Sequence, residues 1–138
     1  MSEYKHWVVG FLFKNRSEVA LVLKNRPEFQ KGKLNGPGGK IEDGETAESA
    51  MRREFKEETG ADVRDWRAFA LLKEEAGDVT FLVSHGEYEV KTITDEPVAW
   101  YRVDDLKNQP TLSDLAWLIP LALDDQNRFT TVEYDQPQ

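Results

Sequence analysis

The sequence predicts an α/β fold built on a mixed β-sheet, and three observations lead to this prediction. Short apolar runs with the composition of strands recur along the chain, beginning at Trp7–Phe13. The stretch between Asp43 and Gly60 has the spacing of an amphipathic helix, and a second, apolar helix is expected near the C-terminus. A chain of 138 residues has the length of one domain, so we expect residues 1–138 to form a single folded unit.

The first apolar run begins a hairpin. Trp7–Phe13 is expected to be a buried strand, Lys14–Ser17 its turn, and Glu18–Lys24 the partner strand. A loop over Asn25–Gly36 follows, and in this acidic protein the loop and its borders concentrate cations: Lys24, Arg26, Lys31, Lys33 and Lys40. These cations either meet the phosphates of a substrate or are ordinary exposed side chains.

Arg26 and Lys40 are the preferred candidates for substrate binding among these cations, because they lie nearest the strand end and the next motif. The glycine-rich segment Gly36–Gly39 permits unusual backbone angles and a close approach of the backbone to a ligand. It matches neither the dinucleotide-binding nor the P-loop glycine pattern.

A turn and an acidic helix start are expected at Asp43, Gly44 and Glu45, and Gly60 is expected to stop the helix. This predicted helix carries acids on its apolar side. Its apolar residues recur at i, i+3, i+4 and i+8 and so share one face: Ala47, Ala50, Met51 and Phe55. At about 100° per residue, Glu54 and Glu58 fall in the same sector and Glu57 lies at its edge. The opposite face takes Glu48, Ser49, Arg52 and Lys56.

Buried carboxylates without partners cost several kcal/mol each and repel one another. A hard divalent cation removes this conflict, because Mg²⁺ is held by a few carboxylate oxygens together with water and substrate phosphates. The alternative is a solvated acidic face with ion pairs along the helix, such as Arg53 to Glu57. The coincidence of the acids with the apolar sector favours the metal.

The spacing of Gly39, Glu45 and Arg53-Glu54-Phe55-Lys56-Glu57-Glu58-Thr59-Gly60-Ala61 resembles the Nudix box, G-x5-E-x7-R-E-U-x-E-E-x-G-U. The resemblance implies an α/β/α sandwich with a mixed β-sheet and a loop-helix-loop catalytic box. It implies Mg²⁺ as cofactor, with Mn²⁺ as a substitute ion. The implied metal ligands are the carbonyl of Gly39 and the carboxylates of Glu54, Glu57 and Glu58. Arg53 would orient these acids, while Glu45 and Gly60 would maintain the box geometry. Ala61 is smaller than the usual aliphatic residue, which bears on packing only.

After the box, strands are expected over Asp65–Glu75 and Val79–Val90, joined at Ala76–Asp78, then a polar loop Lys91–Pro97 and a strand Val98–Val103. In the Nudix family, a loop glutamate before such a Trp-containing strand often completes the metal site or acts as base. Glu96, and less favourably Asp95, occupies that place. The alternative is a solvated loop acid, and the general base is left open between Glu57 and Glu96.

The second helix is expected over Asp114–Leu123, with Thr111 or Ser113 as cap and Pro120 kinking or shortening it. Phe129–Tyr134 is expected to be an edge strand. By resemblance to the branch of the family that hydrolyses oxidised purine nucleoside triphosphates, Asn35 and Asp114 take the places of base-reading residues. Alternatively, Asn35 is a turn residue and Asp114 a helix N-terminal acid.

The resemblance implies a Mg²⁺-dependent pyrophosphohydrolase that converts a nucleoside triphosphate, with oxidised purines as candidates, into monophosphate and pyrophosphate. The alternatives are a hydrolase of ADP-ribose or another nucleoside-diphosphate derivative, a non-catalytic nucleotide-binding domain, and a structural acidic-helix module.

Composition adds limits on partners and location. The net charge of −8 argues against binding polymeric nucleic acid, so a small nucleotide is the expected partner of a monomer or homodimer. With no cysteine, a thiolate metal site is excluded and a reducing compartment fits. The start of the sequence lacks the plan of a signal peptide, and no apolar run has the length of a membrane span. We therefore expect a cytoplasmic protein without membrane contact.

Overall fold

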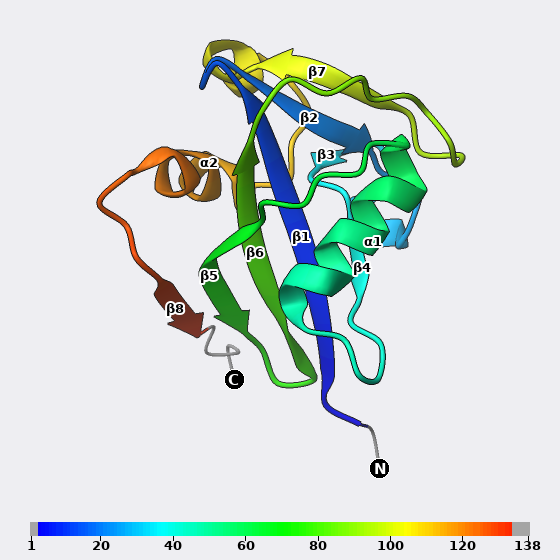
Figure 1. Cartoon of the computed structure of the whole chain (residues 1–138), viewed down its shortest axis with the longest axis vertical. Helices are drawn as coiled ribbons and strands as arrows, with labels where there is room; N and C mark the ends of the chain where they lie inside the picture. The colour runs from blue at the N-terminus through cyan, green and yellow to red at the C-terminus, as the bar shows by residue number, and fades with distance from the viewer. Residues whose placement is uncertain (1–2, 134–138) are drawn as a thin grey trace.

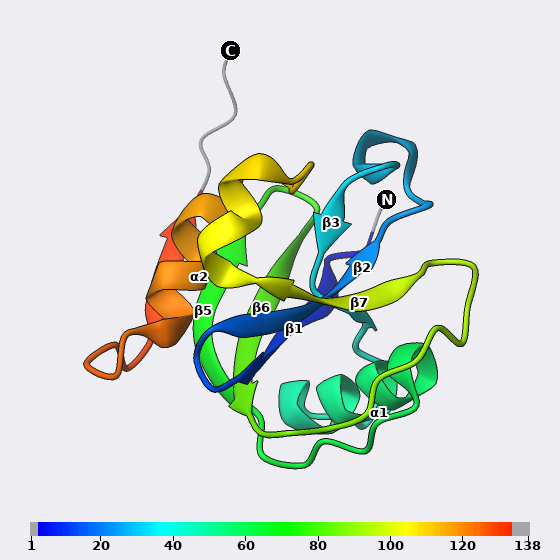
Figure 2. The same ribbon diagram turned by 90° about the horizontal axis from the view of Figure 1, so that it is seen from above.

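A computed structural model describes residues 3–133, which form a mixed β-sheet with a helix on each face (Figure 1). Helix α1 spans Ala47–Thr59 and helix α2 spans Leu115–Leu123, and the view from above places them on opposite sides of the sheet (Figure 2). The predicted α/β architecture with a mixed sheet is confirmed. Neither α-helix in this part of the chain has the length and apolar character needed to cross a bilayer.

The strands are β1 Lys5–Lys14, β2 Glu18–Leu23, β3 Leu34–Asn35, β4 Gly38–Lys40, β5 Arg67–Lys73, β6 Gly77–His85, β7 Val98–Arg102 and β8 Thr130–Glu133. Their order is β3-β2-β1-β6-β5-β8, with β4 paired to β1 and β7 paired to β2. The β1–β6 and β5–β8 pairs are parallel and the other pairs are antiparallel. The central position of β1 explains why its sequence is apolar on both faces.

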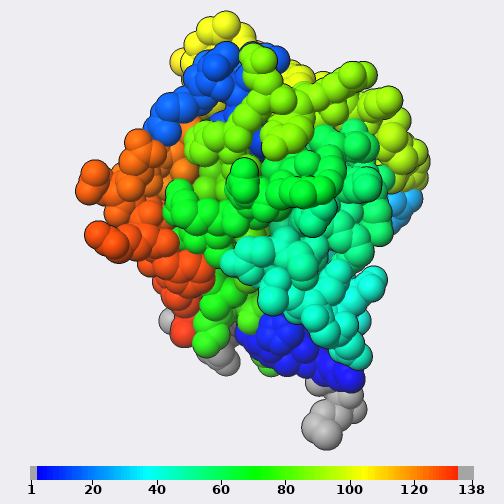
Figure 3. Space-filling view, viewed as in Figure 1, coloured from blue at the N-terminus to red at the C-terminus, as the bar shows by residue number. Residues whose placement is uncertain are grey.

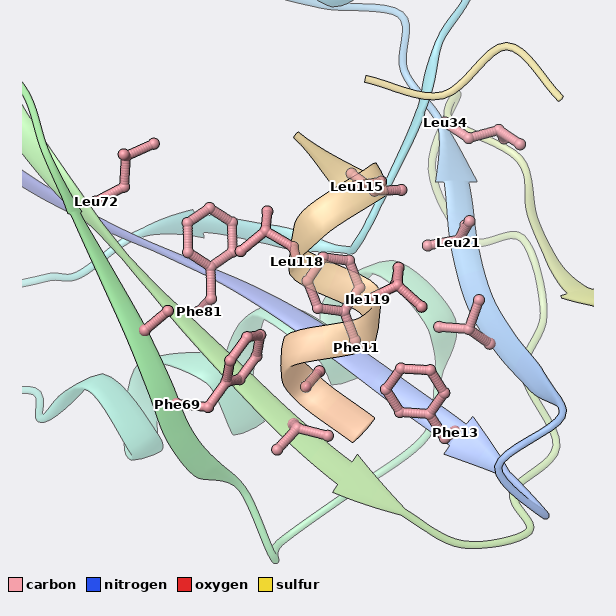
Figure 4. Packing of buried hydrophobic residues seen from close by; sticks show 14 residues of the cluster. Phe11, Phe13, Leu21, Leu34, Phe69, Leu72, Phe81, Leu115, Leu118 and Ile119 are labelled. Atoms are coloured by element: carbon pink, nitrogen blue, oxygen red, sulfur yellow. The ribbon is translucent and has the colours of Figure 1, made fainter. Parts of the chain in front are cut away.

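Strand β1 divides the core into two layers. Phe11 and Phe13 point to the α2 side, where they pack with Phe69, Phe81 and residues of α2 such as Leu118 (Figure 4). On the other side, Val8 and Leu12 pack with the apolar face of α1, which buries Ala50, Met51 and Phe55. The predicted inward face of α1 is therefore confirmed for these three residues, while Ala47 is only partly buried.

Helix α1 lies close to β1 because the strand has a glycine beneath the helix. A Cβ added at Gly10 would lie only 2.7 Å from the sulfur of Met51. The helix starts at a capping box, in which the Thr46 side chain accepts from the amide of Ser49 and the Ser49 hydroxyl accepts from the amide of Thr46. It ends at Gly60, whose φ of 79° is left-handed. The predicted stop at Gly60 is confirmed, and the start is fixed by Thr46 rather than by the acids of the preceding turn.

Several predicted boundaries differ in the structure. The strand predicted over Val79–Val90 ends at His85, because its pairing with β1 runs out where β1 ends. Residues 86–97 then form a loop that hydrogen-bonds to the end of α1 through the Lys91 amide and the Thr59 carbonyl. Figure 3 shows this segment, in yellow-green, on the surface beside α1.

The segment expected to be loop over Asn25–Gly36 contains a short 3₁₀ turn, Glu28–Gln30, as well as β3. A second 3₁₀ turn, Val103–Asn108, takes the place of the turn predicted after β7. Helix α2 starts at Leu115 after Asp114 and has no side-chain cap, so the capping predicted for Thr111 or Ser113 is wrong. The helix continues through Pro120 to Leu123, and the predicted edge strand is β8, with Tyr134 outside the described residues.

Candidate functional site

The three box acids of α1 have different surroundings. The side chain of Glu54 is 16% exposed and Glu58 is buried, whereas the side chain of Glu57 is 58% exposed. The inward direction predicted for Glu54 and Glu58 is thus confirmed, and Glu57 lies at the solvent edge of the same helix. Two carboxylates are therefore enclosed and a third is free to meet a ligand from solvent.

Arg53 ties these acids to the rest of the box. Its guanidinium donates two hydrogen bonds to Glu45, at 2.6 and 2.8 Å, and one to Glu54 at 2.7 Å. It also donates to the Lys40 carbonyl at 3.1 Å and contacts Glu57 at 3.4 Å. The hydrogen bonds from Arg53 lower the pKa of Glu45 to about 2. Arg53 thereby joins the end of β4, the loop before α1 and two box acids, in the arrangement expected of an orienting residue.

Glu58 is the most strongly perturbed acid of the site. Burial raises its pKa to about 8, and the charges of Glu54 and Glu96 act in the same direction, against the lowering influence of Lys24. One carboxylate oxygen accepts a hydrogen bond from the Gly38 amide at 3.0 Å. Burial likewise raises the pKa of Glu54. Burial therefore disfavours the ionised form of both acids, and a bound cation would stabilise that form.

Gly39 is in close contact with Glu54, because a Cβ added at Gly39 would overlap the Glu54 carboxylate. Strand β4 brings the glycine there by pairing with β1, Gly39 facing Val8. Only a residue without a side chain permits this approach of backbone and carboxylate. The described glycines of this segment have no positive φ, so the unusual backbone angles expected there are not found. The backbone packs closely against the Glu54 carboxylate, and its approach to a ligand stays a prediction.

Replacing Gly39 with alanine is expected to displace Glu54 and lower turnover by about 10²-fold or more, since a misplacement of about 1 Å at a reacting centre has that effect. Steady-state kinetics with a nucleotide substrate and Mg²⁺ would measure it. Gly44→Ala is the contrast, because Gly44 has a φ of 84° but nothing within 4 Å of an added Cβ. That variant should lose about 1 kcal/mol of stability to backbone strain and keep its turnover. Unchanged turnover in Gly39→Ala would contradict the assigned close contact.

The residues present fit a Mg²⁺ or Mn²⁺ ion. Within residues 3–133, no three acidic or histidine side chains converge as a complete metal site. The enclosed acids Glu54 and Glu58 flank the backbone of Gly38 and Gly39, and Glu57 is near. Mg²⁺ characteristically takes one or two carboxylates and fills its remaining positions with water and substrate phosphates. The two enclosed carboxylates are the number of protein acids that such an ion takes.

A cavity of about 630 Å³ adjoins these acids, and its lining includes Lys24, Gly38 and Gly39. It also includes Asn35 and Asp114, so the structure brings both predicted base-reading residues to one cavity. Much of the remaining wall is apolar: Trp7, Leu72, Phe81, Leu115 and Leu118. A cavity of this size, with an apolar wall and few polar groups, is typical of a small-molecule site.

Both candidate base-reading residues have partners in the protein. The buried side chain of Asn35 accepts a hydrogen bond from the Gly36 amide at 2.8 Å, and Asp114 accepts one from the Trp117 indole at 3.3 Å. Glu74, which the sequence analysis did not single out, also lines the cavity. Glu74 follows directly after β5, two residues beyond Leu72, and this alternation is the pattern that could have revealed it.

The loop cations are placed differently from the prediction. The cations that line the cavity, among the residues the structure describes, are Lys24 and Lys33. Arg26 instead pairs with Asp95 at 2.6 Å, and Lys40 is exposed on β4 outside the cavity lining. The preference for Arg26 and Lys40 rested on distance along the chain, whereas the fold turns Lys24 and Lys33 towards the cavity.

Glu96 is buried, and donors surround its carboxylate. It accepts hydrogen bonds from the Lys24 ammonium at 3.1 Å and from the amides of Asn25 and Arg26 at 2.7 and 3.2 Å. Burial alone would raise the pKa of Glu96, but these donors outweigh it and the pKa is lowered. The predicted alternative of a solvated loop acid is wrong, and a catalytic role for Glu96 stays a prediction.

Comparison with known proteins places these features in a family. The NUDIX domain family matches residues 4–121. The chain is 34% identical over 113 residues to the oxidized purine nucleoside triphosphate hydrolase of Danio rerio, covering 76% of this chain and 71% of that protein. It is 36% identical over 70 residues to the 8-oxo-dGTP diphosphatase of Escherichia coli, covering 51% of this chain and only 54% of that protein. The NUDIX hydrolase of Nitrosomonas europaea shares the fold, with a TM-score of 0.79 at 16% identity over 97% of this chain and 81% of that one.

Proposed function

Since the chain belongs to the NUDIX domain family of hydrolases, we propose that it is a divalent-metal-dependent pyrophosphohydrolase of nucleoside triphosphates, including those with an oxidised purine base. The products would be the nucleoside monophosphate and pyrophosphate. The observation that carries the proposal is the enclosure of Glu54 and Glu58 against the glycines of strand β4, which line a cavity of about 630 Å³. Such substrates belong to the cytoplasmic nucleotide pool, where we expect the enzyme to act.

Glu54, Glu57, Glu58 and the Gly39 carbonyl are the groups that would hold Mg²⁺ in this proposal. The bound ion would neutralise charge on the phosphate oxygens and lower the pKa of the attacking water. Arg53 keeps Glu54 and Glu57 in place through its hydrogen bonds, and Glu45 in turn fixes Arg53. Lys24 and Lys33 supply positive charge in the cavity wall for the phosphates, in a chain whose net charge is −8.

Glu57 is our choice for the general base: one of its carboxylate oxygens would face the ion, and the other would take the proton. A base has to reach the proton that it removes and has to accept it readily. Glu57 is more than half exposed, and the guanidinium of Arg53 lies 3.4 Å from its carboxylate. Glu96 has three donors on its two oxygens, which reduces its readiness to accept a proton.

Base recognition is assigned to Asn35 and Asp114, together with the apolar wall of the cavity. Hydrogen-bond acceptors there suit the ring and exocyclic N–H groups of a purine, and the amide of Asn35 can donate as well. The matched relatives named for oxidised purine substrates support this assignment.

A hydrolysis panel tests the proposal: normal and oxidised purine nucleoside triphosphates, ADP-ribose and a dinucleoside polyphosphate, each with Mg²⁺, with Mn²⁺ and with EDTA. We expect triphosphates to give monophosphate and pyrophosphate, the oxidised purines to show the highest kcat/KM, and EDTA to abolish turnover. Hydrolysis of ADP-ribose alone would overturn the substrate class in favour of a nucleoside-diphosphate derivative. Nucleotide binding without turnover under all metal conditions would indicate a non-catalytic domain.

A further inference from the structure

Two neighbouring acids of loop 86–97 hold the end of strand β2. Glu96 accepts from the Lys24 ammonium at 3.1 Å and from two backbone amides, those of Asn25 at 2.7 Å and Arg26 at 3.2 Å. Asp95 accepts from the Asn25 side-chain amide at 2.9 Å and from the Arg26 guanidinium at 2.6 Å. We call Asp95 and Glu96, with the three residues that they bind, the acid clasp.

The two acids of the clasp differ in exposure. The side chain of Glu96 is 6% exposed and that of Lys24 is 15% exposed, while those of Asp95 and Arg26 are 52% and 64% exposed. Hydrogen bonds to charged groups in a buried setting contribute more than exposed ion pairs, which are screened by solvent. Glu96 is therefore the member on which the clasp depends, and Asp95 supports it from the surface.

The clasp holds a segment that forms one wall of the cavity. Residues 24–33 close on themselves, because the Lys24 amide donates to the Lys33 carbonyl and the Gly32 amide donates to the Lys24 carbonyl. From this segment Lys24, Pro27, Phe29, Gln30 and Lys33 line the cavity. Phe29 is 73% exposed, so its ring gives the segment little apolar anchorage of its own. The position of this wall accordingly depends on the contacts at its base, around Lys24.

Glu96 also sets the direction of the Lys24 ammonium. Lys24 lines the cavity, lies close enough to Glu58 for its charge to act on that acid, and is bonded to Glu96. A lysine side chain has four rotatable bonds and loses much freedom when it is held in one place. A fixed acceptor at 3.1 Å holds this cation at the cavity before a ligand arrives, which reduces the ordering that binding would require.

We propose that Glu96 is a positioning residue, which fixes the cavity wall of residues 24–33 and the Lys24 ammonium and thereby sets the affinity for the phosphate substrate. This role rests on the proposed hydrolase function for its effect on affinity, but the clasp itself exists without substrate. Glu96 does not accept the proton of the attacking water in this assignment. The loop acid and the basic segment, far apart in sequence, work as one unit of the substrate site.

The test compares Glu96→Gln and Glu96→Ala with Glu89→Gln, a matched change of an exposed acid in the same loop. Amide hydrogen exchange of the metal-free protein is followed by NMR at Asn25 and Arg26. Alanine removes every acceptor, so we expect exchange at these amides to accelerate about tenfold or more. Glutamine keeps one carbonyl oxygen and should restore part of the protection, while Glu89→Gln should match the wild type.

In kinetics with a triphosphate, Glu96→Gln is expected to raise KM about tenfold, to change kcat by less than about threefold and to leave the pH profile of kcat unchanged. A loss of kcat of about 10²-fold or more with KM and amide exchange unaltered would overturn the proposal and assign Glu96 to the chemistry. Should Glu96→Ala fail to fold, the glutamine variant alone decides. Absence of any turnover in the wild type would defeat the hydrolase function instead, and the exchange data would still decide whether the clasp exists.

Discussion

Glu57→Gln is expected to lower kcat by about 10²–10⁴-fold, the contribution usual for general base catalysis, while the protein remains folded. The side chain of Glu57 is 58% exposed and its contact with Arg53 is 3.4 Å long, so its replacement removes little packing and at most a weak ion pair. The glutamine amide has nearly the same shape but cannot take a proton at neutral pH. Steady-state kinetics at saturating Mg²⁺ would measure the loss of kcat, and thermal unfolding would show whether the variant keeps its stability.

Glu48→Gln is the matched control for this variant. Glu48 lies in the first turn of the same helix and is exposed. It faces away from Glu54 and Glu58, so the substitution changes the charge of α1 by the same amount without touching the site. We expect its turnover to equal that of the wild type. If Glu57→Gln retained near-normal turnover with Mg²⁺, the proton would have to be taken by another group.

The parts of the site that could be predicted from sequence are those built by one helix. The period of an α-helix fixes which residues share a face, so the inward position of Glu54 and Glu58 followed from counting residues along the chain. The end of α1 at Gly60 followed from the need for a left-handed residue there. Glu45 and Arg53, eight residues apart, belong to the same local unit and form the pair at 2.6 Å that the box spacing anticipates.

The parts that could not be predicted depend on contacts between distant segments. Arg26 was expected at the substrate, but its partner Asp95 is 69 residues further along the chain. The periodicity of one helix or strand carries no information on such a pair, because the arrangement of the whole sheet decides which loops lie next to each other. The same reason applies to Glu96 and Lys24, and to the short strand β4, whose three residues have too little pattern to be recognised.

The metal-free protein is expected to lose stability as the pH rises from about 4.5 to about 8, and Glu58 is the cause. Burial raises the pKa of Glu58 in the folded protein from 4.5 to about 8. Below pH 4.5 the acid is protonated in both states and its contribution is fully present. Between these values the unfolded chain releases the proton and the folded protein keeps it, which favours unfolding. At about 1.4 kcal/mol per pH unit, the loss across this window is roughly 3–5 kcal/mol.

Glu58→Gln should remove the part of this dependence that Glu58 causes, because its amide remains neutral throughout. The raised pKa of Glu54 acts in the same direction, and Glu54 is present in both proteins. Urea unfolding in EDTA at pH 5.5 and pH 8 would compare the two proteins, and we expect the variant to be the more stable one at pH 8. The lowered pKa of His85, caused mainly by burial, acts in the opposite direction near pH 6, but it is common to both proteins and cancels in their difference. Glu45 and Asp62, whose arginine partners lower their pKa values to about 2, contribute only at more acidic pH.

If the free energy of unfolding changed with pH in the same way in the wild type and in Glu58→Gln between pH 5 and pH 8, the pKa of Glu58 would not be raised by burial. Metal binding gives an independent test of the protonation state of Glu58. Mg²⁺ or Mn²⁺ binds the ionised carboxylate, so either ion should raise the Tm of the wild type and release a proton from Glu58 at pH 7. The glutamine variant has no such proton to release, and its Tm should respond far less. The acid that weakens the empty protein is thus the one through which the cation would stabilise it.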